Sequence, residues 1–127
     1  MTAAAEKAGS PMSRSILVVE DDAMVREVIR ETLERSGFCT TVCRTGEEAL
    51  SLARESCFDA IIIDHFLPRR TGTETTTDLR VHCPLSVIIG ISGAHDGRHF
   101  REAGGDLFLS KPIDIIDMVR YLRERIP

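Results

Sequence analysis

The sequence has few lysines, no cysteine pair at metal-binding spacing and no long apolar run. Of its 16 Lys and Arg residues only two are lysines, Lys7 and Lys111. Lys7 lies in a small, polar segment without a repeating apolar pattern, so Lys111 is the one lysine in the part that we expect to fold. No run approaches the roughly 18 apolar residues that cross a bilayer, which argues against a membrane protein.

The four cysteines, Cys39, Cys43, Cys57 and Cys83, form neither a C-x-x-C pair nor a small disulfide framework, and no secretory segment precedes them. We therefore expect reduced thiols in a cytoplasmic protein, buried as small apolar residues. Cys39 and Cys43 would share one face of a strand, which leaves a redox role open for that pair.

Length and charge further narrow the class of protein. A chain of 127 residues with 43% apolar content is sufficient for one core, and we expect a disordered tail at 1–14 before one domain at 15–127. The formal net charge of -4 gives no field that would gather nucleic acid or anionic lipid. A protein that reads DNA or RNA is therefore disfavoured.

Short apolar runs alternate with amphipathic segments from residue 15 onward. The run Ile61-Ile62-Ile63 is apolar on both faces, as in a strand covered by helices on both sides. The alternation predicts an α/β fold, a doubly wound five-stranded parallel sheet flanked by five helices. We expect strands at 16–19, 38–43, 58–64, 85–92 and 107–109, and helices at 23–35, after Thr45, at 73–81, 95–103 and 114–125. The helix at 73–81 has a weak pattern because it is rich in threonine.

Polar residues follow four of the predicted strands, and the carboxyl ends of parallel strands share one edge. Clustered carboxylates repel one another, so such a site either binds a cation or keeps some carboxyls protonated. Oxygen ligands without His or Cys favour Mg²⁺ over Zn²⁺. A carboxylate beside an ammonium and a hydroxyl suits phosphoryl transfer. The residues at this edge are Glu20, Asp21 and Asp22 after the first strand, Asp64 after the third, Ser92 at the end of the fourth and Lys111 after the fifth.

Other interpretations of these residues stay open at this point. The three acids after the first strand could serve only the first turn of a helix. An aspartyl-phosphate hydrolase of the HAD type also uses a strand-end aspartate with Mg²⁺, but it has a second aspartate two residues later, where this sequence has Phe66. A flavin-binding module would have a phosphate-cradling loop where the acids stand. His65, His82, His95 and His99 fit surface or loop positions.

Four segments together resemble the response-regulator receiver family over about residues 15–126. They are Ser15-Ile-Leu-Val-Val-Glu-Asp-Asp22, Asp64-His-Phe-Leu-Pro-Arg-Arg-Thr-Gly72, Ser92-Gly93-Ala94 and Lys111-Pro112. The resemblance implies the flavodoxin-like receiver fold and a phosphoryl group carried on Asp64. It also implies that the Lys111–Pro112 peptide bond is cis.

The family pattern assigns a role to each matching residue. Glu20 and Asp21 are the acidic pair, with Asp21 a direct Mg²⁺ ligand, and the backbone carbonyl of Phe66 is a further ligand. The hydroxyl of Ser92 and the ammonium of Lys111 contact the phosphoryl group, and Phe108 is the switch aromatic. Glu20 replaces the aspartate more common in the family. Bulky Phe66 beside the acceptor motivates the hypothesis of slow self-dephosphorylation.

The resemblance also implies partners. A histidine kinase or a histidine phosphotransfer protein would donate the phosphoryl group, and an unidentified protein would read the surface of the fourth helix, fifth strand and fifth helix. The protein would be a monomer, or a weak dimer that forms through that surface. It would catalyse only its own phosphorylation and dephosphorylation. We expect a stand-alone regulator, with a receiver fragment of a hybrid kinase or longer regulator as the alternative.

Overall fold

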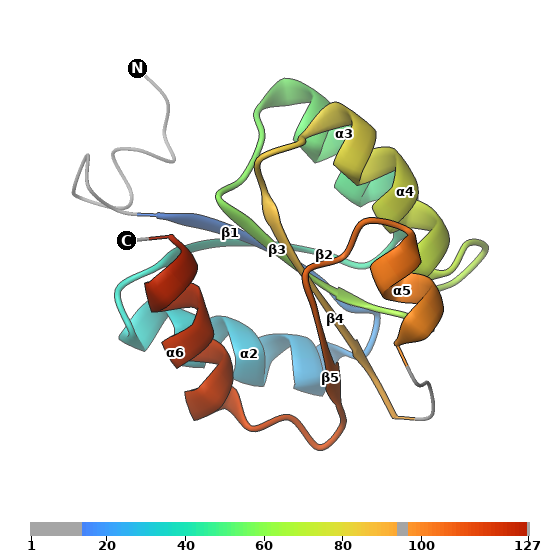
Figure 1. Cartoon of the computed structure of the whole chain (residues 1–127). Helices are drawn as coiled ribbons and strands as arrows, with labels where there is room; N and C mark the ends of the chain where they lie inside the picture. Colours follow the sequence, from blue (N-terminus) through green and yellow to red (C-terminus); the bar gives the residue numbers. More distant parts are fainter. Residues whose placement is uncertain (1–13, 94–96, 127) are drawn as a thin grey trace.

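A computed structural model describes residues 14–93 and 97–126 of the chain. Five strands form one fully parallel sheet in the order β2-β1-β3-β4-β5 (Figure 1). The strands are β1 (Ser15–Val19), β2 (Cys39–Cys43), β3 (Ala60–Asp64), β4 (Val87–Ser92) and β5 (Leu107–Ser110). The helices among the described residues are α2 (Ala23–Arg35), α3 (Gly46–Glu55), α4 (Gly72–His82), α5 (Arg98–Glu102) and α6 (Ile115–Arg125). The predicted fold class is confirmed.

The helices cover both faces of the sheet, as Figure 1 shows. On one face α2 and α6 pack against Ile16, Val18 and Ile62. On the other face α3, α4 and α5 pack against Leu17, Ile61 and Ile63. Alternate residues of the central strands therefore enter two separate cores, which is why their sequences are continuously apolar. None of the described helices combines the length and the apolar content needed to cross a membrane.

The start of α2 is fixed by a side chain of the acidic segment. The Asp22 carboxylate accepts hydrogen bonds from the backbone N–H groups of Met24 and Val25, at 3.0 and 3.1 Å. These bonds satisfy two amides that have no partner within the helix. Asp22 thus caps α2, a role that the sequence left open for all three acids. The carboxylates of Glu20 and Asp21 lie near that of Asp64 instead.

The threonine-rich segment forms a complete helix, α4, longer at each end than the predicted 73–81. Its start is a capping box in which Thr71 and Glu74 bond to each other's backbone N–H groups. Thr75 and Thr76 are fully buried, and their hydroxyls donate to the carbonyls of Thr71 and Gly72. Because these bonds satisfy the hydroxyls within the helix, threonines can fill the buried face in place of aliphatic residues.

Several predictions fall on residues that the structure does not describe. The tail predicted at 1–14 lies outside the described residues except for Arg14, and so do Ala94, His95 and Asp96. The helix predicted at 95–103 is described from Arg98 as α5. The cis bond expected between Lys111 and Pro112 is present.

The expectation of four reduced thiols is wrong for two of them. Cys57 and Cys83 form a disulfide with their Cα atoms 5.8 Å apart, although 26 positions separate them in the sequence. Cys57 lies after α3 and Cys83 caps the end of α4, so the packing of the two helices brings them together. The predicted burial is confirmed for Cys43 and Cys83 but is wrong for Cys57, which is exposed, and for Cys39, which is half-buried. Burial raises the pKa of the Cys43 thiol to about 12.

Candidate functional site

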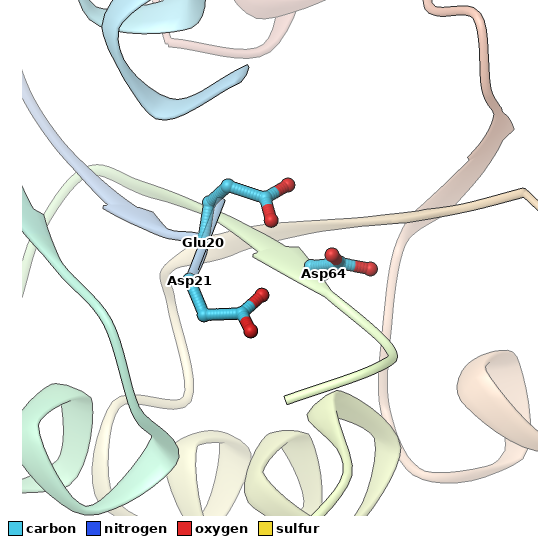
Figure 2. A group of neighbouring side chains, drawn as sticks. All are labelled: Glu20, Asp21 and Asp64. Carbon is cyan, nitrogen blue, oxygen red and sulfur yellow. The ribbon is translucent and has the colours of Figure 1, made fainter. Parts of the chain in front are cut away.

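Three carboxylates meet at the carboxyl edge of the sheet. Glu20 and Asp21 follow β1, and Asp64 is the last residue of β3, the strand that pairs with β1. One carboxylate oxygen from each lies within 4.8 Å of the other two. Figure 2 shows the three side chains extending to the same side of the strand ends. The parallel register therefore places acids that are 43 positions apart in one cluster.

Burial makes this cluster electrostatically costly. Glu20 is 0% exposed and Asp64 4% exposed, whereas Asp21 lies at the surface. Burial raises the pKa of the Glu20 carboxyl to about 7, and the neighbouring Asp64 adds to this rise. A hydrogen bond from the Asp22 backbone N–H and one from Lys111 act in the opposite direction. The cluster thus favours either a bound cation or a shared proton.

Lys111 supplies the positive charge of the site. Its Nζ lies 3.1 Å from Glu20 Oε1 and 3.1 Å from Asp64 Oδ2. Burial lowers the pKa of this ammonium, but the hydrogen bonds and attraction of the two carboxylates outweigh it, and the pKa is raised above 10.5. Lys111 is therefore a permanent cation at neutral pH.

The cluster suits a divalent metal by charge and by ligand type. Three ionised carboxylates opposed by one ammonium retain two formal negative charges, the amount that a divalent ion neutralises. All ligand atoms of the cluster are carboxylate oxygens, the donors that Mg²⁺ and Ca²⁺ prefer. The residues present thus fit such an ion.

The backbone around Asp64 is held in place from two sides. The Phe66 N–H donates to Asp64 Oδ1 at 3.2 Å, and the Gly72 N–H donates to the His65 carbonyl at 2.8 Å. A Cβ atom at Gly72 would collide with the carbonyl oxygen of Asp64. The first residue of α4 therefore packs directly against the peptide of the acidic residue, an approach that only glycine permits.

Ser92 and Phe108 lie where the strand pattern predicts them. Ser92 ends β4, is fully buried, and accepts a hydrogen bond through its carbonyl from the Lys111 N–H at 2.8 Å. Phe108 lies in β5, half-buried, with its ring 5.8 Å from that of Phe100. A Cβ atom on Gly97 would lie 2.6 Å from the Phe108 ring, so this glycine leaves room for the aromatic.

Phe66 and His65 form the outer wall of the site after Asp64. Phe66 is 57% exposed and makes an edge-on contact with the His65 ring at 4.8 Å between centroids. His65 Nδ1 lies 2.9 Å from the Thr73 hydroxyl. An exposed aromatic thus stands two residues after Asp64, where a HAD-type hydrolase would have its second aspartate.

Two features of the site escaped the sequence-based prediction. The capping box at Thr71 and Glu74 carries the T-x-x-E signature and could have been found from the sequence. The approach of Gly97 to Phe108 has no local signature, because the two residues come from different elements.

Comparisons with known proteins show the family of this chain. The family model described as "Response regulator receiver domain" matches residues 16–123. The chain is 34% identical over 117 residues to the polar-differentiation response regulator DivK of Brucella ovis, covering 88% of this chain and 95% of the relative. The solved receiver domain of the Francisella response regulator 1452 is 26% identical with a TM-score of 0.83, over 90% of this chain and 97% of that one.

A CheY-like receiver domain protein from Methanospirillum hungatei is similar in structure as well. Its TM-score is 0.85 at 25% identity, covering 90% of this chain and 94% of that chain. The family match and the solved structures agree with the five-stranded parallel topology. The chain belongs to the response regulator receiver domain family and works in phosphorylation-based two-component signalling.

Proposed function

We propose that Asp64 accepts a phosphoryl group from a phosphohistidine on a histidine kinase or a histidine phosphotransfer protein. The observation that carries this proposal is the double contact of Lys111, 3.1 Å from the carboxylates of both Asp64 and Glu20. A nucleophile, an ammonium and two further carboxylates at one edge supply the positioning and charge that phosphoryl transfer requires.

Each residue has a defined part in the transfer. An Asp64 carboxylate oxygen attacks phosphorus, a P–O bond forms, and the P–N bond to the donor imidazole breaks. Lys111 moves its contact from the carboxylate to a phosphoryl oxygen, and the Ser92 hydroxyl donates to another. Glu20, Asp21, Asp64 and the Phe66 carbonyl would hold Mg²⁺, which supplies neutralisation of the phosphoryl charge when bound.

The surface around the site supports a protein donor. Met24 and Val28 on α2 are 78% and 49% exposed, and they line one groove together with Lys111, Pro112 and Ile113. Any donor that brings a phosphohistidine to Asp64 must cover this rim, and apolar side chains exposed there favour contact with a second protein. The groove thus fits the proposed partner.

The response to phosphorylation involves the elements after Ser92. Ser92 is drawn toward the new phosphoryl group, and Phe108 moves with it because β4, which carries Ser92, pairs with β5, which carries Phe108. This changes the surface of α5, β5 and α6, which a downstream protein reads and through which a weak dimer can form. We further propose that the domain at 15–127 acts in the cytoplasm and is a signalling switch, not an enzyme that turns over a metabolite.

The test is phosphorylation by acetyl phosphate, and by a phosphoramidate as the mimic of phosphohistidine, with and without Mg²⁺. Wild type should gain one phosphoryl group only with Mg²⁺, and Asp64→Asn should gain none. Asp78→Asn, at an exposed aspartate of α4, is the matched control and should be modified like wild type. Modification of Asp64→Asn to the wild-type extent would refute the assignment.

A further inference from the structure

We propose that Cys57 and Cys83 form a reversible thiol–disulfide modification site, in which Cys57 is the sulfur attacked and Cys83 the sulfur released. The pair lies before β3 and β4, whereas Asp64 and Ser92 end those strands. Parallel strands of five and six residues place the two ends roughly 16–20 Å apart. The proposal therefore concerns the opposite edge of the sheet and does not rest on the proposed function.

The two cysteines differ in access to solvent. Cys57 is exposed in the segment between α3 and β3, whereas Cys83 is 1% exposed at the end of α4. Thiol–disulfide exchange needs a thiolate to approach a sulfur in line with the bond that breaks, so access decides which sulfur is attacked. A small thiol can therefore reach Cys57, whereas burial shields Cys83 from it.

The fold also has hydrogen-bond acceptors for both thiols of the reduced state. The Ala53 carbonyl lies 3.9 Å from each sulfur, and the His82 carbonyl lies 3.8 Å from that of Cys57. A disulfide sulfur carries no hydrogen, so these acceptors can receive a bond only after reduction. Both thiols therefore have a carbonyl acceptor when the disulfide is reduced, so the backbone needs no rearrangement to accommodate the reduced state.

The exchange balances with a low-molecular-weight thiol such as glutathione. Its thiolate attacks the Cys57 sulfur, the bond between the cysteines breaks, and Cys83 leaves as a thiolate that takes up a proton. A second thiolate attacks the mixed disulfide and releases Cys57. Two small thiols become one small disulfide while the protein disulfide becomes a dithiol, and oxidised glutathione drives the reverse reaction.

The disulfide closes a covalent loop that contains one strand and one helix of the fold. Residues 57–83 include β3, the loop after Asp64 and all of α4, so the bond joins the end of α3 to the end of α4. Closing a loop with a separation of 26 residues restricts the unfolded chain, and its reduction should lower Tm by about 10 °C. Disulfides in a reducing compartment, where they occur, are typically transient and regulatory.

The experiment uses the full chain in buffers of varied reduced-to-oxidised glutathione ratio, followed by alkylation and peptide mapping. We expect the Cys57 and Cys83 peptides to be linked under oxidising conditions and both alkylated under reducing conditions. The redox-dependent change in Tm should disappear in Cys57→Ser. A pair that stays reduced at every ratio, or a linkage that involves Cys39 or Cys43, would overturn the proposal.

Matched single variants test the order of attack. In Cys83→Ser the remaining Cys57 should form a mixed disulfide with glutathione rapidly. In Cys57→Ser the buried Cys83 should react at least about tenfold more slowly, because it becomes accessible only when α4 opens locally. Equal rates in the two variants would contradict the assigned roles even if the disulfide itself forms.

Discussion

The Lys111 ammonium lies 3.1 Å from the Asp64 carboxylate, although 47 positions separate the two residues in the sequence. We expect Lys111→Ala to slow phosphorylation of Asp64 by about 10²–10³-fold, the cost of removing one charged group that stabilises a transition state. The rate of labelling by acetyl phosphate at saturating Mg²⁺ measures this. Lys111→Arg keeps the charge and should lose less activity; equal rates in wild type and Lys111→Ala would contradict the assignment.

Glu20 gives the metal-free protein a pH-dependent stability. Its pKa is raised from 4.5 to about 7 by burial, so the folded protein binds more protons than the unfolded chain between these values. The free energy of unfolding should therefore fall as pH rises through this window. Thermal melts of metal-free protein across it should show a steeper decrease in wild type than in Glu20→Gln.

Added Mg²⁺ should offset the loss of stability that the metal-free protein shows as pH rises. Metal ligation requires the deprotonated Glu20, so added Mg²⁺ should raise Tm more at about pH 8 than at about pH 6. Melting curves with and without Mg²⁺ at the two pH values test this. A rise in Tm that is independent of pH would show that the protonation of Glu20 is not linked to the metal.

Phe66 bears on the lifetime of the phosphorylated state. The side chain is 57% exposed beside Asp64 and offers no group to orient an attacking water. An amide in its place can hold such a water, so Phe66→Asn should shorten the half-life of phosphorylated Asp64 by at least about threefold. The decay of the phosphoprotein with time measures it, and an unchanged half-life would refute the hypothesis of slow self-dephosphorylation.

Gly97 should tolerate no side chain while Phe108 is packed beneath it. Gly97 has φ of +78°, and its Cβ atom would lie 2.6 Å from the Phe108 ring. We expect Gly97→Ala to reduce the free energy of unfolding by about 1–3 kcal/mol, from strain and overpacking together. Urea unfolding measures the loss.

Two other glycines separate the contributions. Gly37 has φ of +97° with open space around its Cβ position, so Gly37→Ala reports the backbone strain alone. Gly93 has open space and no such φ, so Gly93→Ala should change stability little. If Gly97→Ala costs no more than Gly37→Ala, contact with Phe108 has no role in the loss.

The sequence predicts most of the architecture because strands that are buried on both faces of the sheet have continuously apolar sequences. Runs such as Ile61-Ile62-Ile63 can be satisfied only in the middle of a covered sheet, and the acids and Lys111 follow from the shared edge of parallel strands. The sequence pattern of α4 is weak, although its predicted bounds differ by only one residue at each end, because buried Thr75 and Thr76 do not form an apolar stripe. Their hydroxyl bonds become evident only in the folded helix.

Contacts between distant elements account for what could not be predicted. The partners of the Cys57–Cys83 disulfide meet through the packing of α3 against α4, and spacing in the sequence gives no sign of it. The same holds for Gly97 and Phe108. The acidic segment was ambiguous because neighbouring acids have different duties, with Asp22 capping α2 and Glu20 contacting Lys111.

The glycine that begins α4 and the one that begins α3 together limit how the molecule can move. A side chain at Gly72 would collide with the Asp64 carbonyl, and one at Gly46 would collide with Thr75 of α4. The amino-terminal half of α4 is thus held between β3 and α3, and this packing leaves no room for a shift toward either. We expect this half of α4 to keep its position on phosphorylation. The displacement should then be confined to the part of the molecule that holds α5, β5 and α6.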